Sequence, residues 1–215
     1  MRPRLLDLFC GAGGCAVGYH RAGFDVVGVD INPQPNYPFE FHQSDALDPP
    51  VRLEGFDAIH ASPPCQAFSI ASLFHGRRAS HVDLVAPTRS LLLESGLPWV
   101  MENVAASPLR RDLMLCGEMF GLQVHRHRYF ETHGFFAMQS RHMKHRLKGA
   151  ATNTETRDGY ARGVYGHMAD WRGAARAMEV EWMGTMDEVA QAIPPAYTEH
   201  IGHYLMSAVR MREAA

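Results

Sequence analysis

The sequence predicts an α/β fold of the Rossmann-like type with a mostly parallel sheet. Three observations predict it: short apolar strands alternate with helical segments, a glycine-rich turn follows the first strand, and an aspartate ends the second strand. Residues 4–9 and 25–30 are the first two predicted strands. Between them lie the turn at residues 11–14 and a helix predicted over 15–22.

The later elements follow the same alternation. Residues 56–61 and 99–101 each follow a turn residue and are predicted strands. The leucines of residues 84–94 have helical spacing, and a last helix is predicted over 195–212, opening on a proline. After residue 130 the apolar periodicity fades, so we expect an insertion with little core over residues 131–178.

Composition sets limits on the function. The chain has 215 residues, 46% hydrophobic and 20% charged, which is typical of a globular domain with a core. The net charge of −2 does not indicate nucleic acid, although a local basic patch is enough to bind it. The absence of a long apolar run or signal peptide, together with four cysteines in no Cys-x-x-Cys pair, predicts an intracellular protein without membrane contact.

The first turn has features of a nucleotide-type site. Gly11-x-Gly13-x-x-Ala16, placed between a strand and a helix, lets the backbone approach a ligand closely. Asp30 ends the second strand, where such folds place an acid that binds ribose hydroxyls. Asp45 is a candidate contact to an adenine amino group. The alternatives are a tight strand–helix turn, a solvated aspartate at 30 and a turn or helix cap at 45.

Four separate motifs occur in a characteristic order: Asp-Leu-Phe-Cys-Gly-Ala-Gly-Gly at 7–14, Ser-Pro-Pro-Cys-Gln at 62–66, Glu-Asn-Val at 102–104 and Arg-His-Arg at 126–128. The set resembles the DNA (cytosine-5-)-methyltransferase family, well over residues 4–130 and moderately over 186–202. Two positions depart from the family: Val124 stands where Gln is usual, and Gln191 stands where a late Gly-Asn motif would fall.

The resemblance implies an S-adenosylmethionine-dependent methyltransferase fold and methylation of cytosine carbon 5 in double-stranded DNA, with the base flipped out of the helix. Cys65 is then the nucleophile, and Glu102 bonds cytosine N3 and its amino group. Arg126 and Arg128 alternate with histidines, so on a strand they share a face and reach the base oxygen, Glu102 and phosphate. The alternatives are a buried structural cysteine, a surface glutamate and a solvated basic face.

The resemblance also divides the chain into a catalytic domain at 1–130, a target-recognition insertion at 131–178 and a returning segment at 179–215. The expected cofactor-binding residues are Phe9, Gly11, Gly13, Asp30, Asp45, Pro63 and Gln191. The expected DNA-binding residues are Gln66, Ser69, Lys144, Arg157 and Arg162. Among the last group, the two arginines flank a predicted loop tip and are candidate base readers, whereas Lys144 contacts phosphate.

Three further expectations concern partners and metal. We expect a monomer that binds S-adenosylmethionine and DNA. His125-x-His127 and His142-x-x-His145 are compatible with zinc, but no cysteine pair or His-Glu-x-x-His motif completes a site, so no metal is expected. Two alternative functions stay open: a tRNA cytosine-5 methyltransferase and a catalytically silent DNA-binding relative.

Overall fold

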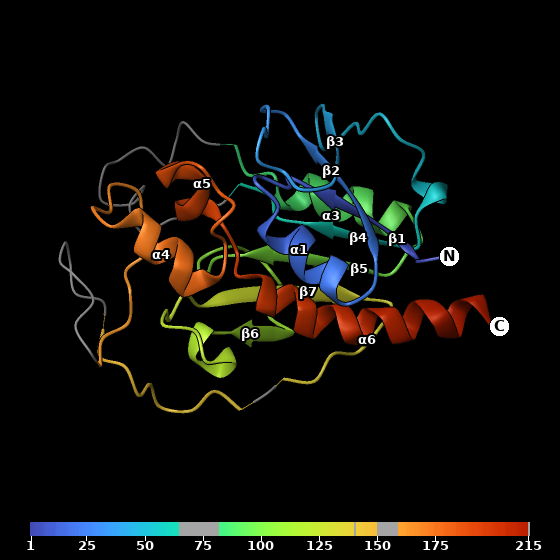
Figure 1. Ribbon diagram of the computed structural model, residues 1–215. Coiled ribbons are helices and arrows are strands. Elements are labelled where there is room, and N and C mark those ends of the chain that lie inside the picture. Colours follow the sequence, from blue (N-terminus) through green and yellow to red (C-terminus); the bar gives the residue numbers. More distant parts are fainter. Residues whose placement is uncertain (65–81, 140, 150–158, 215) are drawn as a thin grey trace.

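A seven-stranded sheet forms the centre of the computed structural model, which describes residues 1–64, 82–139, 141–149 and 159–214. The strand order in this described part is β3-β2-β1-β4-β5-β7-β6 (Figure 1). Five strands are parallel, β7 runs antiparallel to β5, and β6 runs antiparallel to β7. The bounds are Arg4–Leu8 (β1), Asp25–Asp30 (β2), Glu40–Gln43 (β3), Ala58–Ala61 (β4), Trp99–Asn103 (β5), Leu113–Leu115 (β6) and Arg128–His133 (β7). The predicted α/β class is confirmed.

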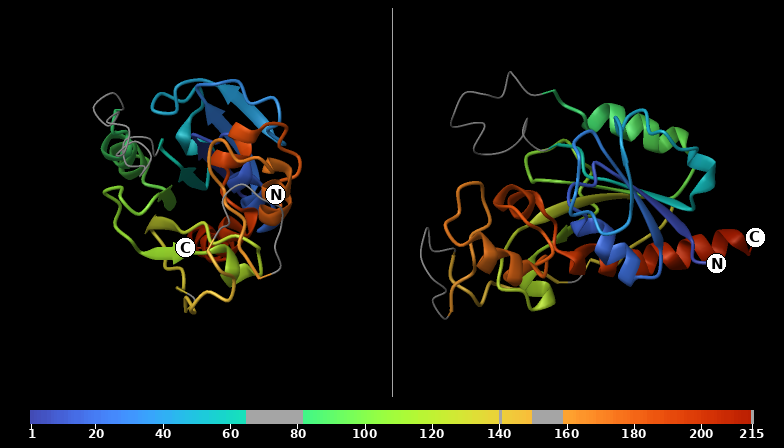
Figure 2. Two further views of the ribbon diagram at one scale, coloured as in Figure 1. Left: turned by 90° about the vertical axis from the view of Figure 1, so that its left-hand side faces the viewer. Right: turned by 45° about the horizontal axis from the view of Figure 1, so that its top comes forward.

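Helices cover both faces of the sheet. The helices α1 (Gly14–Arg21) and α6 (Pro195–Glu213) lie on one face, and α3 (Val85–Glu94) lies on the other (Figure 2). Leu5 joins the core beneath α1 and α6, whereas Leu6 joins the core beneath α3. Successive strand residues point to opposite faces, so a strand covered on both sides reads as a continuous apolar run.

The last helix packs beside the first strand–turn–helix unit. The Thr198 hydroxyl of α6 donates a hydrogen bond to the Cys15 carbonyl of α1 at 2.8 Å. A Cβ built at Gly18 would lie 2.1 Å from the Pro195 carbonyl oxygen, so the two helices approach too closely for any side chain there. The C-terminal segment therefore belongs to the same core as the N-terminal strands.

The segment after residue 130 contributes more to the core than its sequence predicts. Helix α4 (Trp171–Met178) lies inside the expected insertion, and Ala174, Ala175 and Met178 are buried in the core shared with α1 and α6. Its buried face consists mainly of Gly and Ala, which explains why no strong apolar pattern marked it. Helix α5 (Met186–Gln191) follows, opened by a capping box at Thr185.

Short elements were also missed. The sequence predicted neither β3 nor β6, nor the 3-10 turns η1 (Leu53–Gly55) and η3 (Gly117–Phe120). These elements have three or four residues each, too few for a period to be recognised. Among the described residues, no helix has the length and apolar character needed to cross a membrane.

Candidate functional site

Two of the four motifs meet where the strand order reverses. Strand β1 pairs in parallel with both β2 and β4, so its carboxyl end lies at the switch point of the sheet. Open α/β sheets bind ligands at this position. The glycine turn follows β1, and the segment at 62–64 follows β4. The Ser62 backbone N–H donates to the Leu8 carbonyl at 3.1 Å, which places the two motifs side by side.

The glycine turn has the backbone geometry that ligand-binding turns require. Gly11 and Gly13 have φ values of +48° and +86°, which glycine adopts at little cost. Phe9 has a φ of +56° without being glycine, and such strain concentrates at functional sites. The indole N–H of Trp182 donates to the Ala12 carbonyl at 2.9 Å, so the C-terminal segment supports the turn.

The two candidate cofactor aspartates differ in their surroundings. Asp30 lies against the turn: its Oδ2 accepts from Gly11 N–H at 3.1 Å and its Oδ1 from Asn32 N–H at 2.9 Å. Asp45 is exposed, and its Oδ1 accepts from Leu47 N–H at 2.9 Å. The turn-cap alternative for Asp45 is therefore what the structure shows, while its contact to adenine stays a prediction.

A third carboxylate was not singled out from the sequence. Asp7 on β1 is 1% exposed, and neither of its carboxylate oxygens has a hydrogen-bond partner among the described residues. Burial and the nearby charge of Asp30 raise the pKa of Asp7 well above its usual range. The signal was an acid inside an otherwise apolar strand, Arg-Leu-Leu-Asp-Leu. Buried acids without partners suit a cationic ligand group.

The predicted meeting of Glu102 and Arg128 is confirmed. Glu102 lies near the end of β5, Arg128 opens β7, and Arg128 Nε is 3.2 Å from Glu102 Oε1. The exposed fractions of the two side chains are 16% for Arg128 and 7% for Glu102, so the ion pair is shielded from water. Burial raises the pKa of Glu102, and the positive charges of Arg128 and Arg126 oppose that rise.

The prediction that Arg126 and Arg128 share one strand face is wrong. Strand β7 begins only at Arg128, and Arg126 has a φ of +32°, so alternation does not extend to it. The Arg126 guanidinium instead donates to the carbonyls of Ala192 at 2.7 Å and Ala190 at 2.8 Å. Arg126 thus ties the end of α5 to the site, and it acts on Glu102 through its charge.

Asn103 joins two of the motifs through hydrogen bonds of its side chain. Its side-chain amide donates to the Pro63 carbonyl at 2.9 Å, and its Oδ1 accepts from Val104 N–H at 2.8 Å. Pro63 and Asn103 are both buried. The end of β5 therefore fixes the segment that leads toward Cys65.

A buried polar chain beneath the site was missed. His60 Nδ1 lies 3.0 Å from the Tyr19 hydroxyl, and its Nε2 lies 2.9 Å from the Ser62 hydroxyl. Burial lowers the pKa of His60 to about 3, so the ring is neutral and bonds through both nitrogens. Ser62 in turn forms a hydrogen bond that stabilises the Glu102 carboxylate. A histidine within a strand does not reveal these partners by spacing.

Gln191 lies in the segment that closes the glycine turn. It is the last residue of α5, and its side chain is exposed. A Cβ built at Gly14 would lie 2.4 Å from the Ile193 carbonyl oxygen, so this segment rests directly on the turn. The structure places Gln191 beside the predicted cofactor site, and its contact to the cofactor stays a prediction.

Some of the residues predicted to act on DNA lie outside the described part of the chain, and others lie within it. Cys65, the predicted nucleophile, and Gln66, Ser69 and Arg157 lie outside the described residues. Lys144 is exposed, in a stretch that also exposes Arg141, Arg146 and Lys148.

Arg162, predicted to flank a loop tip and to read a base, forms an ion pair within the protein, and its base contact stays a prediction. Its guanidinium pairs with Asp170, which caps α4, and 13% of the Arg162 side chain is exposed. Gly173 leaves room for this guanidinium, which a Cβ at 173 would meet at 2.2 Å. Sequence spacing to Gly159 indicated a turn, but the capping carboxylate that captures the arginine comes from eight residues further along.

Comparisons with known proteins agree with this arrangement. Residues 3–106 match the model of the C-5 cytosine-specific DNA methylase family. The type II methyltransferase M.AquIA of Picosynechococcus sp. is 33% identical over 129 residues, which cover 48% of this chain and 49% of that protein. The chain spans about half the length of the type II methyltransferases it matches first.

Solved structures share the fold over nearly the whole chain. A candidate DNA modification methyltransferase encoded within an E. coli prophage superposes with a TM-score of 0.69 at 16% identity, covering 97% of this chain and 99% of the other. The Dnmt2 methyltransferase of S. pombe gives a TM-score of 0.56 at 13% identity, with coverages of 98% and 99%. The matched region contains the glycine turn, the Pro-Pro-Cys segment and the Glu-Asn-Val motif. Residues 3–106 of the chain are therefore similar to the C-5 cytosine-specific DNA methylase family.

Proposed function

We propose that this chain transfers a methyl group from S-adenosylmethionine to carbon 5 of cytosine in double-stranded DNA, through a covalent intermediate on Cys65. The observation that supports it most is the buried Glu102–Arg128 pair, held beside the Pro63 segment at the edge that carries the glycine turn. The chain spans only part of its relatives, so substrate and partner belong to the proposal.

The residues at the switch point fit the cofactor. S-adenosylmethionine supplies an electrophilic methyl group on a sulfonium and also carries an ammonium group. Asp7 has two buried carboxylate oxygens with no hydrogen-bond partner among the described residues, and a cationic group beside them would favour the ionised form of this acid. Asp30 is held at the turn with lone pairs left for ribose hydroxyls. Phe9 and Pro63 then lie beside the adenine, where an apolar surface is needed.

The chain's own groups carry the steps on the base. The Cys65 thiolate attacks carbon 6 of the flipped cytosine, and the electron pair of the 5,6 double bond becomes available at carbon 5. Glu102, whose pKa is raised by burial, donates to N3 in its protonated form and so offsets the negative charge that develops. After carbon 5 has accepted the methyl group, loss of its proton re-forms the double bond and expels the thiolate.

The exposed cations of residues 141–148 suit the DNA backbone. Arg141, Lys144, Arg146 and Lys148 are exposed within eight residues, although the whole chain has a net charge of −2. Contacts with phosphates position a protein on DNA without reading its sequence. We assign catalysis to residues 1–130, target recognition to 131–178 and closure of the cofactor site to 179–215.

A trapping experiment tests the proposal. The protein is incubated with a random duplex pool in which 5-fluorocytosine replaces cytosine, with and without S-adenosylmethionine. Fluorine cannot leave carbon 5 as a cation, so a complex that survives denaturation should accumulate only with the cofactor. Cys65→Ala should abolish the complex, while Cys10→Ala, which changes a buried thiol beside the turn, should retain it.

Three outcomes would contradict the proposal. A complex that persists in Cys65→Ala would exclude this residue as the nucleophile. Methylation of transcribed tRNA but not of DNA would support the tRNA alternative. DNA binding without any methyl transfer would support a catalytically silent relative.

A further inference from the structure

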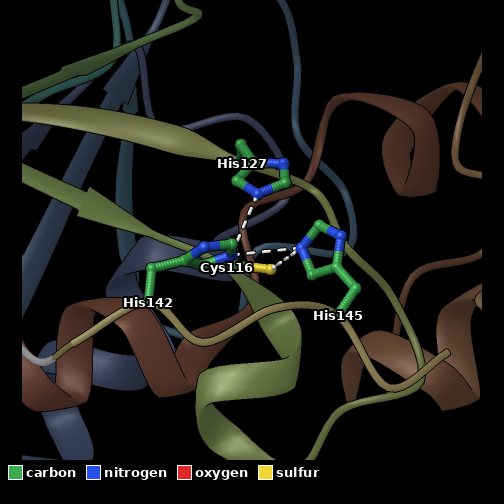
Figure 3. Close-up of side chains that lie close together, drawn as sticks. All are labelled: Cys116, His127, His142 and His145. Carbon is green, nitrogen blue, oxygen red and sulfur yellow. Dashed lines mark hydrogen bonds between the residues drawn. The ribbon is translucent and has the colours of Figure 1, made fainter.

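Four potential metal ligands converge at the edge of the sheet, on the far side of Arg128 from the glycine turn. Cys116 directly follows β6 and His127 directly precedes β7. The antiparallel register pairs Leu115 with Arg128, which brings Cys116 and His127 opposite each other. His142 and His145 enter from the segment beyond β7 and point to the same centre (Figure 3).

The separations match a tetrahedral site. The Nε2 atom of His142 lies 3.2 Å from His127 Nε2 and 3.1 Å from His145 Nε2, and the Cys116 Sγ lies 3.4 Å from His145 Nε2. All four ligand atoms lie within 4.8 Å of one another. Zinc bonds of about 2.0–2.1 Å to nitrogen and about 2.3 Å to sulfur give tetrahedron edges of about 3.3–3.6 Å. Three of the six ligand–ligand pairs are therefore already close to these edges, and all six lie within 4.8 Å.

Hydrogen bonds alone do not account for this convergence. A neutral imidazole nitrogen carries either one N–H or one lone pair, so it makes one good in-plane bond. Yet His142 Nε2 faces two other Nε2 atoms, and His145 Nε2 faces both His142 and the Cys116 sulfur. At least one of these close contacts must then place two N–H groups, or two lone pairs, against each other. A cation at the centre makes all four contacts favourable, because each ligand atom presents a lone pair to it.

We propose that Cys116, His127, His142 and His145 bind one Zn²⁺ ion in a structural site. Three imidazoles and one thiolate are ligands that zinc prefers, and four protein ligands leave no open position for catalysis. Cys116 is 0% exposed and the three histidines are half-buried, so the centre is shielded as structural sites require. The sequence predicted no metal because the ligands come from separate segments and only one of them is a cysteine.

The surroundings hold the histidine segment in place. The Glu118 carboxylate accepts from the backbone N–H groups of Arg146 at 3.0 Å and Leu147 at 2.7 Å. The His145 ring stacks on the His125 ring, with centroids 3.8 Å apart and an interplanar angle of 8°. Such outer contacts orient ligands before the ion binds.

The site has a structural consequence for the rest of the chain. His127 lies between Arg126 and Arg128, and His142 and His145 flank Lys144. A bound ion would tether the basic segment to the strand that presents Arg128 to Glu102. This inference rests on the ligand geometry and does not require the proposed methyl transfer.

Metal analysis tests the site directly. The full chain is expressed without a histidine tag in zinc-supplemented medium, and elemental analysis should find about one zinc per chain. His142→Ala should lose most of this zinc, whereas His203→Ala, at an exposed histidine of α6, should keep it. Substoichiometric zinc in the wild-type chain with no uptake on titration, or equal zinc in both variants, would overturn the proposal.

Cobalt substitution gives a spectrum of the wild-type chain, and this spectrum does not depend on how any variant folds. Wild-type protein stripped by a chelator and reloaded with Co²⁺ should show the strong visible absorption of a tetrahedral site and a thiolate-to-cobalt charge-transfer band. Cys116→Ser should lose the charge-transfer band. A weak octahedral spectrum without a thiolate band in the wild-type chain would refute the assignment.

Discussion

Separating the Glu102–Arg128 pair tests whether this buried contact organises the site. The variants are Arg128→Met, Glu102→Gln and the double substitution. Methionine keeps an unbranched side chain of similar length, and glutamine keeps the shape of the carboxylate. Both singles break the 3.2 Å ion pair, but only Arg128→Met leaves a buried acid without its partner.

The expected loss of stability follows from the distance between the two charged groups. At an effective dielectric constant of about 20, unit charges separated by 3.2 Å attract by about 5 kcal/mol. Much of this offsets desolvation, so Arg128→Met should lower the free energy of unfolding by about 3–5 kcal/mol at pH 8. Glu102→Gln should lower it by about 1–3 kcal/mol, because Arg128 keeps its 2.9 Å bond to the His127 carbonyl.

The contribution of Glu102 to the free energy of unfolding changes with pH in one direction. Since burial raises the folded-state pKa of Glu102, the folded chain binds more protons than the unfolded chain between the ordinary and the raised values. The associated stability is present at low pH and is lost as pH rises through the raised pKa. Arg128→Met raises that pKa further, because the main opposing charge is gone. The destabilisation by Arg128→Met should therefore be greater at about pH 8 than at about pH 5.5.

Urea unfolding of all four chains at both pH values provides the measurement. A double-mutant cycle should give a coupling energy of about 1–3 kcal/mol at the higher pH. Arg21→Met serves as the control, because the Arg21–Glu179 pair is 40% and 53% exposed and contributes at most about 1 kcal/mol. Additive single effects, or a destabilisation by Arg128→Met that does not change with pH, would refute the reasoning.

Three other substitutions test separate parts of the site. Asp30→Ala should weaken S-adenosylmethionine binding by about 1.5–3 kcal/mol in calorimetry, while Asp25→Ala, at the far end of the same strand, should not. Asn103→Ala removes the donor to the Pro63 carbonyl and should lower stability by about 1–3 kcal/mol together with the rate of methyl transfer. Lys144→Ala should weaken binding to all DNA sequences and reduce the salt slope by about 0.9, and an unchanged slope would exclude a phosphate contact.

The sequence alone determined the main sheet and the order of its motifs. Residues 26–29 of β2 lack polar side chains because this strand is covered on both faces, and the glycine turn is recognisable because only a few backbone conformations fit between a strand and a helix. Parallel strands place their carboxyl ends at one edge, so motifs far apart in the chain could be expected to meet there. The contact between Asn103 and Pro63 follows from this rule, because β5 and β4 are parallel.

Only the tertiary structure decided what depends on contacts between distant side chains. Local spacing predicted a shared face for Arg126 and Arg128, but β7 begins too late, and the α5 carbonyls bind Arg126 instead. Arg162 was expected beside a loop tip as a candidate base reader, and the structure pairs it with Asp170, the cap of α4. Asp7, which has no hydrogen-bond partner in the described part of the chain, lies within an otherwise apolar strand and was not recognised.

The cluster of Cys116 with three histidines shows the same limit most clearly. Its ligands lie directly after β6, directly before β7 and in the segment beyond β7, so no short stretch of sequence contains all of them. Periodicity and motif spacing report what the backbone imposes locally. Which charges pair and which ligand atoms converge depends on strand register and on the path of the chain between elements, and those are settled only when the sheet edge is assembled.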